Sequence, residues 1–79
     1  MRYVSVRVVD SGGRPKRASR VALEIHQFLA GGVKSDNTDS DGLAQFSLDV
    51  DDGAEVTVMV DGNVKISRGP IKAQYLITT

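Results

Sequence analysis

Apolar and polar residues alternate with a period of two along most of the chain. In four segments a hydrophobic residue occupies every second position. Strict alternation of this kind is typical of strands that turn one face toward a core and the other toward solvent. The predicted inward sets are Val4, Val6 and Val8; Val21, Leu23 and Ile25; Ala44, Phe46, Leu48 and Val50; and Val56, Val58 and Val60.

Turn-forming residues separate the alternating segments at intervals of roughly ten residues. Glycine supplies the positive φ angles that tight turns need, and Asp and Asn side chains bond to their own backbone. Residues 20–29 also fit a short helix, but their β-branched residues favour a strand. The pattern predicts about seven strands, near residues 2–9, 20–28, 33–38, 43–50, 55–61, 63–68 and 71–78.

Length and composition narrow the fold class. A chain of 79 residues is expected to form one domain, spanning 1–79. Strands with one apolar face are best covered by a second sheet, so we predict an all-β, two-sheet sandwich. Cysteine is absent, which excludes disulfides and cysteine-ligated zinc.

Three motifs of the chain are shared with a known group of sandwich domains. They are Val6-x-Val8-Val9-Asp10-x-x-Gly13-x-Pro15, Thr38-Asp39-x-Asp41-Gly42-x-Ala44-x-Phe46 and Val56-x-Val58-x-Val60. In these motifs the chain resembles the prealbumin-like sandwiches, which include carboxypeptidase regulatory-like, Cna-B-type and bacterial immunoglobulin-like domains. The resemblance implies an immunoglobulin-like (prealbumin-like) sandwich of Greek-key type that serves as a spacer, adhesion or accessory module.

The chain departs from two active members of that group. Many Cna-B-type domains link a lysine of the first strand to an Asn or Asp of the last, yet residues 2–9 contain no lysine and residues 73–79 contain neither partner. Transthyretin-like hydrolases need several His and Arg residues and a Tyr-Arg-Gly-Ser end. One histidine and the ending Tyr75-Leu76-Ile77-Thr78-Thr79 argue against that activity.

The acidic segment 36–42 has two interpretations. Asn37, Asp39 and Asp41 followed by Gly42 match the first half of a calcium loop. Leu48 stands where the closing carboxylate belongs, so the favoured interpretation is a hairpin turn whose carboxylates bond backbone N–H groups. A second acidic cluster, Asp49, Asp51 and Asp52, is expected at the opposite end of the intervening strand.

The remaining polar candidates are one histidine and a basic run. The alternation places His26 on the outer face of its strand, where a surface role is the simplest interpretation. Ten basic and ten acidic residues balance, and aromatic residues are few, which argues against nucleic acid and carbohydrate as ligands. An acidic partner could still contact the basic run, formed by Arg14, Lys16, Arg17 and Arg20.

The last predicted strand has few charges and high β propensity. At a sheet edge, such a strand would be a template for self-association or for a partner strand, with Tyr75 as a candidate contact. The sequence therefore predicts a non-catalytic interaction or structural module without a cofactor. The alternatives are weak calcium-dependent adhesion and a transthyretin-like hydrolase. No apolar stretch could span a membrane. A complete chain is expected in the cytoplasm, and a fragment of a longer protein at the cell surface or outside.

Overall fold

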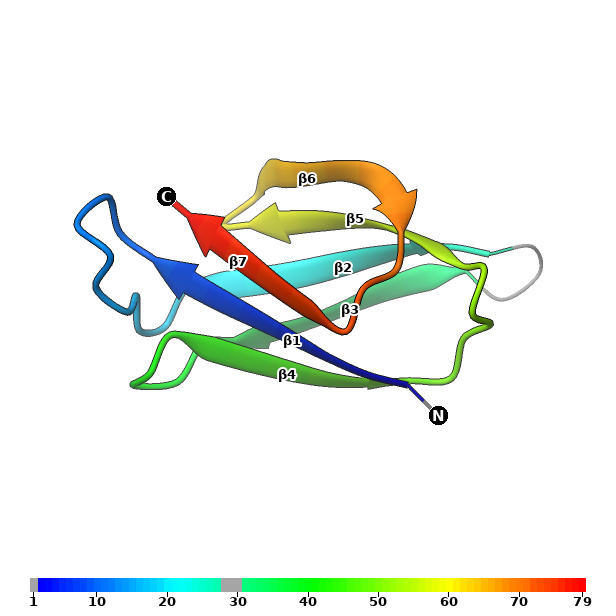
Figure 1. Cartoon of the computed structure of the whole chain (residues 1–79), viewed down its shortest axis with the longest axis horizontal. Coiled ribbons are helices and arrows are strands. Elements are labelled where there is room, and N and C mark those ends of the chain that lie inside the picture. Colours follow the sequence, from blue (N-terminus) through cyan, green and yellow to red (C-terminus); the bar gives the residue numbers. More distant parts are fainter. Residues whose placement is uncertain (1, 28–30) are drawn as a thin grey trace.

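The computed structural model describes residues 2–27 and 31–79, and the chain within them forms seven strands (Figure 1). The predicted strands are confirmed, with ends displaced by a few residues. The predicted strand end at Phe28 and the turn residue Ala30 lie outside the described residues. The strands are β1 (Arg2–Val9), β2 (Arg20–His26), β3 (Gly32–Asn37), β4 (Leu43–Leu48), β5 (Glu55–Val60), β6 (Asn63–Pro70) and β7 (Gln74–Thr78).

The strands form two facing sheets of unequal width. One sheet has three strands in the order β4-β1-β7, and the other has four in the order β3-β2-β5-β6. All neighbouring strands are antiparallel except β1 and β7, which run parallel. The three-stranded sheet lies in front in Figure 1. The predicted all-β sandwich of two sheets is therefore confirmed.

The core lies between the two sheets and contains the predicted inward residues. All of them are buried apart from Val50, which is partly buried against the core. Residues from the end of the chain complete it, because β7 points its alternate side chains inward. The additional buried hydrophobic residues are Ala54, Ile71, Tyr75 and Ile77.

The hairpin between β5 and β6 has the turn chemistry that its sequence predicts. Asp61 and Gly62 both have positive φ, at 51° and 85°, and they join the paired residues Val60 and Asn63. Two central residues with positive φ define the tight turn whose twist matches that of the flanking strands. The side chain of Asp61 also accepts a hydrogen bond from the backbone amide of Arg20 at 2.9 Å, which ties this turn to the start of β2.

The acidic turn is not a hairpin, contrary to the prediction from sequence. It leads from β3 in the four-stranded sheet to β4 in the three-stranded sheet. Gly42, at φ +73°, presents its carbonyl to the amide of Val8 at 2.7 Å. This bond starts β4 alongside β1, so the chain crosses between the sheets and does not fold back on β3.

We predict that Gly42→Ala strongly destabilises the fold. A Cβ at Gly42 would lie 2.5 Å from the Val8 carbonyl oxygen, and its φ of +73° disfavours any other residue. Backbone strain of this kind costs about 1–3 kcal/mol before the clash is added. The measurement is the free energy of unfolding in urea. Gly53→Ala is the matched control, because nothing lies within 4 Å of its Cβ position. Equal midpoints for the two variants would contradict this account of the crossing.

Candidate functional site

The acidic turn binds its own backbone. Asp39 Oδ1 accepts hydrogen bonds from the amides of Asp41 at 2.8 Å and Leu43 at 3.0 Å. The amide of Gly42 donates to the Asp39 carbonyl at 3.0 Å. The carboxylate most central to the calcium hypothesis therefore bonds backbone amides of its own turn, as the favoured interpretation predicted.

Thr38 fastens this turn to the β1–β2 connection, a role that sequence reasoning missed. Its side chain is buried, accepting the amide of Ser19 at 2.9 Å and donating to the Lys16 carbonyl at 2.6 Å. Its backbone adds bonds to Ala18 and Ser19. Both connections cross between the sheets at this end of the molecule, so one hydroxyl ties two crossings together.

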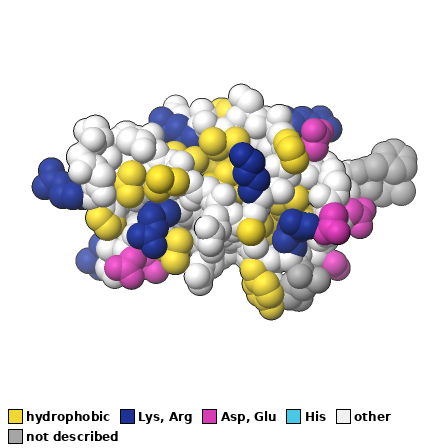
Figure 2. Space-filling view, viewed as in Figure 1, with side chains coloured by type: hydrophobic (Ala, Val, Ile, Leu, Met, Phe, Trp, Pro, Cys, Tyr) yellow, Lys and Arg dark blue, Asp and Glu magenta, His cyan; other side chains and the backbone are white. Residues whose placement is uncertain are grey.

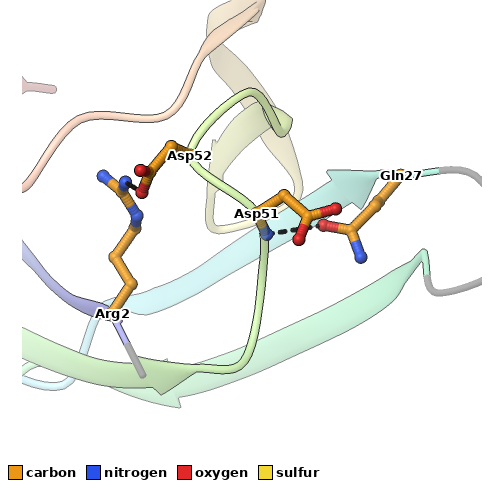
Figure 3. A network of polar contacts seen from close by, with 4 residues as sticks. All are labelled: Arg2, Gln27, Asp51 and Asp52. Atoms are coloured by element: carbon orange, nitrogen blue, oxygen red, sulfur yellow. Dashed lines mark hydrogen bonds and ion pairs between the residues drawn. The ribbon is translucent and has the colours of Figure 1, made fainter.

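The second acidic cluster lies at the other end of β4, as predicted, and is tied to both sheets (Figure 3). Asp52 forms an ion pair with Arg2 at the start of β1. The amide of Asp51 donates to Gln27 Oε1, just beyond β2, at 3.0 Å. Because Arg2 and Gln27 belong to opposite sheets, this loop closes the second end of the sandwich.

Acidic side chains do not converge on one point. Across residues 2–27 and 31–79, no three His, Cys, Asp or Glu side chains form a group that could hold a metal ion. The two acidic turns occupy opposite ends of β4, which separates Asp39 and Asp41 from Asp51 and Asp52 (Figure 1).

His26 lies half-buried on the outer face of the four-stranded sheet. Its Nε2 is 2.9 Å from Oγ1 of the buried Thr57 on the neighbouring strand β5. The residue paired with His26 across β5 is Glu55, and the carboxylate of Glu55 accepts from Arg68 at 2.9 Å. The first bond gives the buried Thr57 hydroxyl a partner, and the second fastens β6 to β5. His26, Thr57, Glu55 and Arg68 thus all have a structural role.

The basic run lies on and beside the β1–β2 connection, at one end of the sandwich (Figure 1). Arg14 forms an ion pair with Asp10 at 3.5 Å, and Arg20 bonds Ser35 at 3.4 Å. Lys16 is half-buried, with its amide donating to the Val8 carbonyl, and Arg17 is exposed in a turn. Two of the four side chains are thus engaged with neighbours in the fold.

The last strand is a free sheet edge, the condition that the sequence analysis left open. Within residues 2–27 and 31–79, β7 pairs with β1 alone, through an unbroken register from Ser5–Gln74 to Val9–Thr78. Ser5 donates to the Ala73 carbonyl and Thr79 donates to the Val9 carbonyl, each at 2.9 Å. These two bonds show that the odd-numbered residues of β7 bond β1. In a parallel pair, the N–H and C=O groups of the alternate residues Gln74, Leu76 and Thr78 therefore point away from β1.

Leu76, and not Tyr75, is the side chain that this strand presents to solvent. Leu76 is 67% exposed, whereas Tyr75 is only 8% exposed and its hydroxyl accepts the amide of Lys72 at 3.0 Å. The predicted contact through Tyr75 therefore moves to its neighbours Gln74, Leu76 and Thr78. The signal was present in the sequence, because Tyr75 alternates with the other two apolar residues that are buried here, Ile71 and Ile77.

The other three edges have features that oppose strand pairing. β3 carries Gly32, Lys34 and Asp36, and β6 carries Pro70, two basic residues and two register shifts against β5. β4 is uncharged, but it contacts β3 across the side of the sandwich (Figure 1). Charge, proline and bulges are devices by which proteins protect sheet edges. β7, with the sequence Gln-Tyr-Leu-Ile-Thr, has none of them.

A shallow groove runs along the outer face of the three-stranded sheet beside this edge. Its volume is about 490 Å³. Leu43 and Leu76 flank Arg7 across the three strands, because both pair with it. The groove is lined by Ser5, Arg7, Leu43, Gln74, Tyr75 and Leu76.

Comparisons of the chain with protein-family models, with curated proteins and with solved structures found no match. The described residues also contain no helix long and apolar enough to cross a membrane. The assignment of function therefore rests on the residues and their geometry.

We predict that Thr38→Val destabilises the protein by about 1–3 kcal/mol, because it leaves the Ser19 amide and the Lys16 carbonyl without their buried partner. Chemical denaturation measures the loss. Thr78→Val is the matched control, since Thr78 is exposed on β7. A loss no larger than that of the control would show that the two hydrogen bonds of the Thr38 hydroxyl contribute nothing to stability.

We also predict that millimolar calcium leaves the thermal midpoint unchanged, because Asp39 Oδ1 is already bonded to two amides. Differential scanning calorimetry with and without the ion tests this. A midpoint that rises with calcium and no longer rises in Asp39→Asn would establish a calcium site.

Proposed function

We propose that this domain is a non-catalytic interaction module that binds a partner protein by accepting one of its strands at the free edge of β7. The observation that carries the proposal is the condition of that edge. Its outward backbone groups belong to Gln74, Leu76 and Thr78, and the strand has no charge, proline, glycine or bulge. Main-chain hydrogen bonds to such an edge supply affinity, and side chains on the added strand supply specificity.

The groups that could perform acid–base or nucleophilic chemistry support a non-catalytic role. His26 bonds Thr57, Glu55 bonds Arg68, and Asp39 bonds backbone amides. Each bond stabilises a turn or a strand pair, and none of the three groups borders the groove beside β7. The groove itself offers a hydroxyl, an amide and a guanidinium, which are groups suited to recognition.

The division of strands between the sheets favours the prealbumin-like type within the resemblance noted above. In an immunoglobulin constant-type domain, the first, second, fifth and fourth strands share one sheet. Here β1 lies with β4 and β7, while β2 lies with β3, β5 and β6. Spacer, adhesion and accessory roles, which the resemblance implies, are all roles in which a domain binds another protein.

Selection of strands from a random peptide library tests the proposal. We predict that peptides selected on the domain bind Leu76→Lys at least roughly tenfold more weakly, because a lysine on an edge opposes strand addition. Val33→Lys is the matched control, since Val33 is 62% exposed on the protected edge β3. Leu76 is exposed, so both variants are expected to fold, and their urea midpoints verify this. A selection without binders, or binders that tolerate Leu76→Lys, would contradict the proposal.

A further inference from the structure

We infer that the strand added at β7 is a single extended segment with acidic residues at alternate positions, and that it is not a second copy of this chain. The inference rests on the strand-addition function proposed above, and it specifies the occupant of the edge. Two independent observations carry it: the unequal width of the two sheets, and the distribution of charge around the open edge.

The three-stranded sheet is one strand short on the β7 side. β4 contacts β3 at the opposite side, and β7 crosses in front of β2 and ends near the tip of β5 (Figure 1). β6, at the top of that view, has no strand in front of it. Ile66 on β6 pairs with the fully buried Val58 yet is itself only partly buried. A strand added beside β7 would lie over β6 and cover Ile66.

The uncovered width suits one strand and not a whole second domain. Strands in a sheet lie about 4.8 Å apart, and facing sheets about 10 Å apart. A second copy that added its β7 would bring with it its own β2 and β5, which face that strand. That space is already filled by β6 of the first copy, so the two four-stranded sheets would collide. A lone extended segment brings no such layer.

The elements that border the edge are basic, although the whole chain is neutral. From Gly62 to Thr79 the chain contains Lys65, Arg68 and Lys72 and no acidic residue. Arg68 is paired with Glu55, whereas the described residues give no acidic partner to Lys65, Lys72 or the exposed Arg7 beside Leu76. Figure 2 shows hydrophobic and basic side chains over the central part of this face, whereas the acidic side chains lie toward its ends, where further basic ones also lie.

These features define a pattern for the occupant. Alternate side chains of the added strand would face Ile66 across the sandwich, where an apolar residue extends the core. The remaining side chains would face outward, beside Leu76 and Arg7, where Asp or Glu would meet the guanidinium of Arg7. Complementary charge of this kind sets specificity and association rate at an interface.

Synthetic nonapeptides in which valine alternates with glutamate, glutamine or lysine test the inference by fluorescence anisotropy. At low salt, about 50 mM, we expect the glutamate peptide to bind roughly tenfold more tightly than the glutamine peptide, and the lysine peptide most weakly. The difference should shrink at about 500 mM salt. Arg7→Gln should remove most of it, because Arg7 pairs with Leu76 on that face, while the control Lys34→Gln on β3 should preserve it.

The outcomes separate this inference from the function on which it rests. Equal binding of the glutamate and glutamine peptides, lost in Leu76→Lys, would overturn the acidic occupant and leave strand addition intact. A dimer in sedimentation that Leu76→Lys dissociates would show that a second copy occupies the edge. If none of the peptides binds, or if binding survives Leu76→Lys, strand addition itself is wrong and the inference falls with it.

Discussion

Each apolar strand face in this protein must be covered by the opposite sheet, and seven strands cannot be divided equally between two sheets. A core of mostly valine, leucine and isoleucine is stable only when water is excluded from both layers. The chain places four strands in one sheet and three in the other. The shortfall lies next to β7, where Ile66 is left partly covered and three residues direct backbone groups outward. The edge proposed to bind a partner strand is thus a consequence of how the strands are divided between the sheets.

The two ends of the sandwich hold that arrangement in place by different means. At one end, the Thr38 hydroxyl and the Gly42 carbonyl secure the crossings from β1 to β2 and from β3 to β4. At the other, Arg2 and Gln27 from opposite sheets bind the loop between β4 and β5. Both acidic segments serve these connections. The carboxylates of Asp39 and Asp52 and the amide of Asp51 are engaged by these contacts.

The fold could be predicted from sequence because strand alternation is a local property. Val4 to Val8 or Val56 to Val60 reveal their buried face without any knowledge of their neighbours. The pairing of strands is not local, and this is why the prediction of a hairpin at residues 36–42 is wrong. Its turn chemistry is that of a hairpin, but the approach of Gly42 to Val8 decides which sheet receives β4. The edge position of β7 could not be predicted for the same reason, because the residues of β7 do not show which strand lies beside it.

Amide hydrogen exchange along β7, measured by NMR on the free domain and with the alternating valine–glutamate peptide, tests the central claim most directly. The account predicts slow exchange for Tyr75 and Ile77 in the free domain, because their amides donate to β1, and fast exchange for Leu76 and Thr78. On binding, Leu76 and Thr78 should become slow as well. Slow exchange of Leu76 before any peptide is added, or fast exchange that persists at saturation, would contradict the claim that this edge is open to a partner strand.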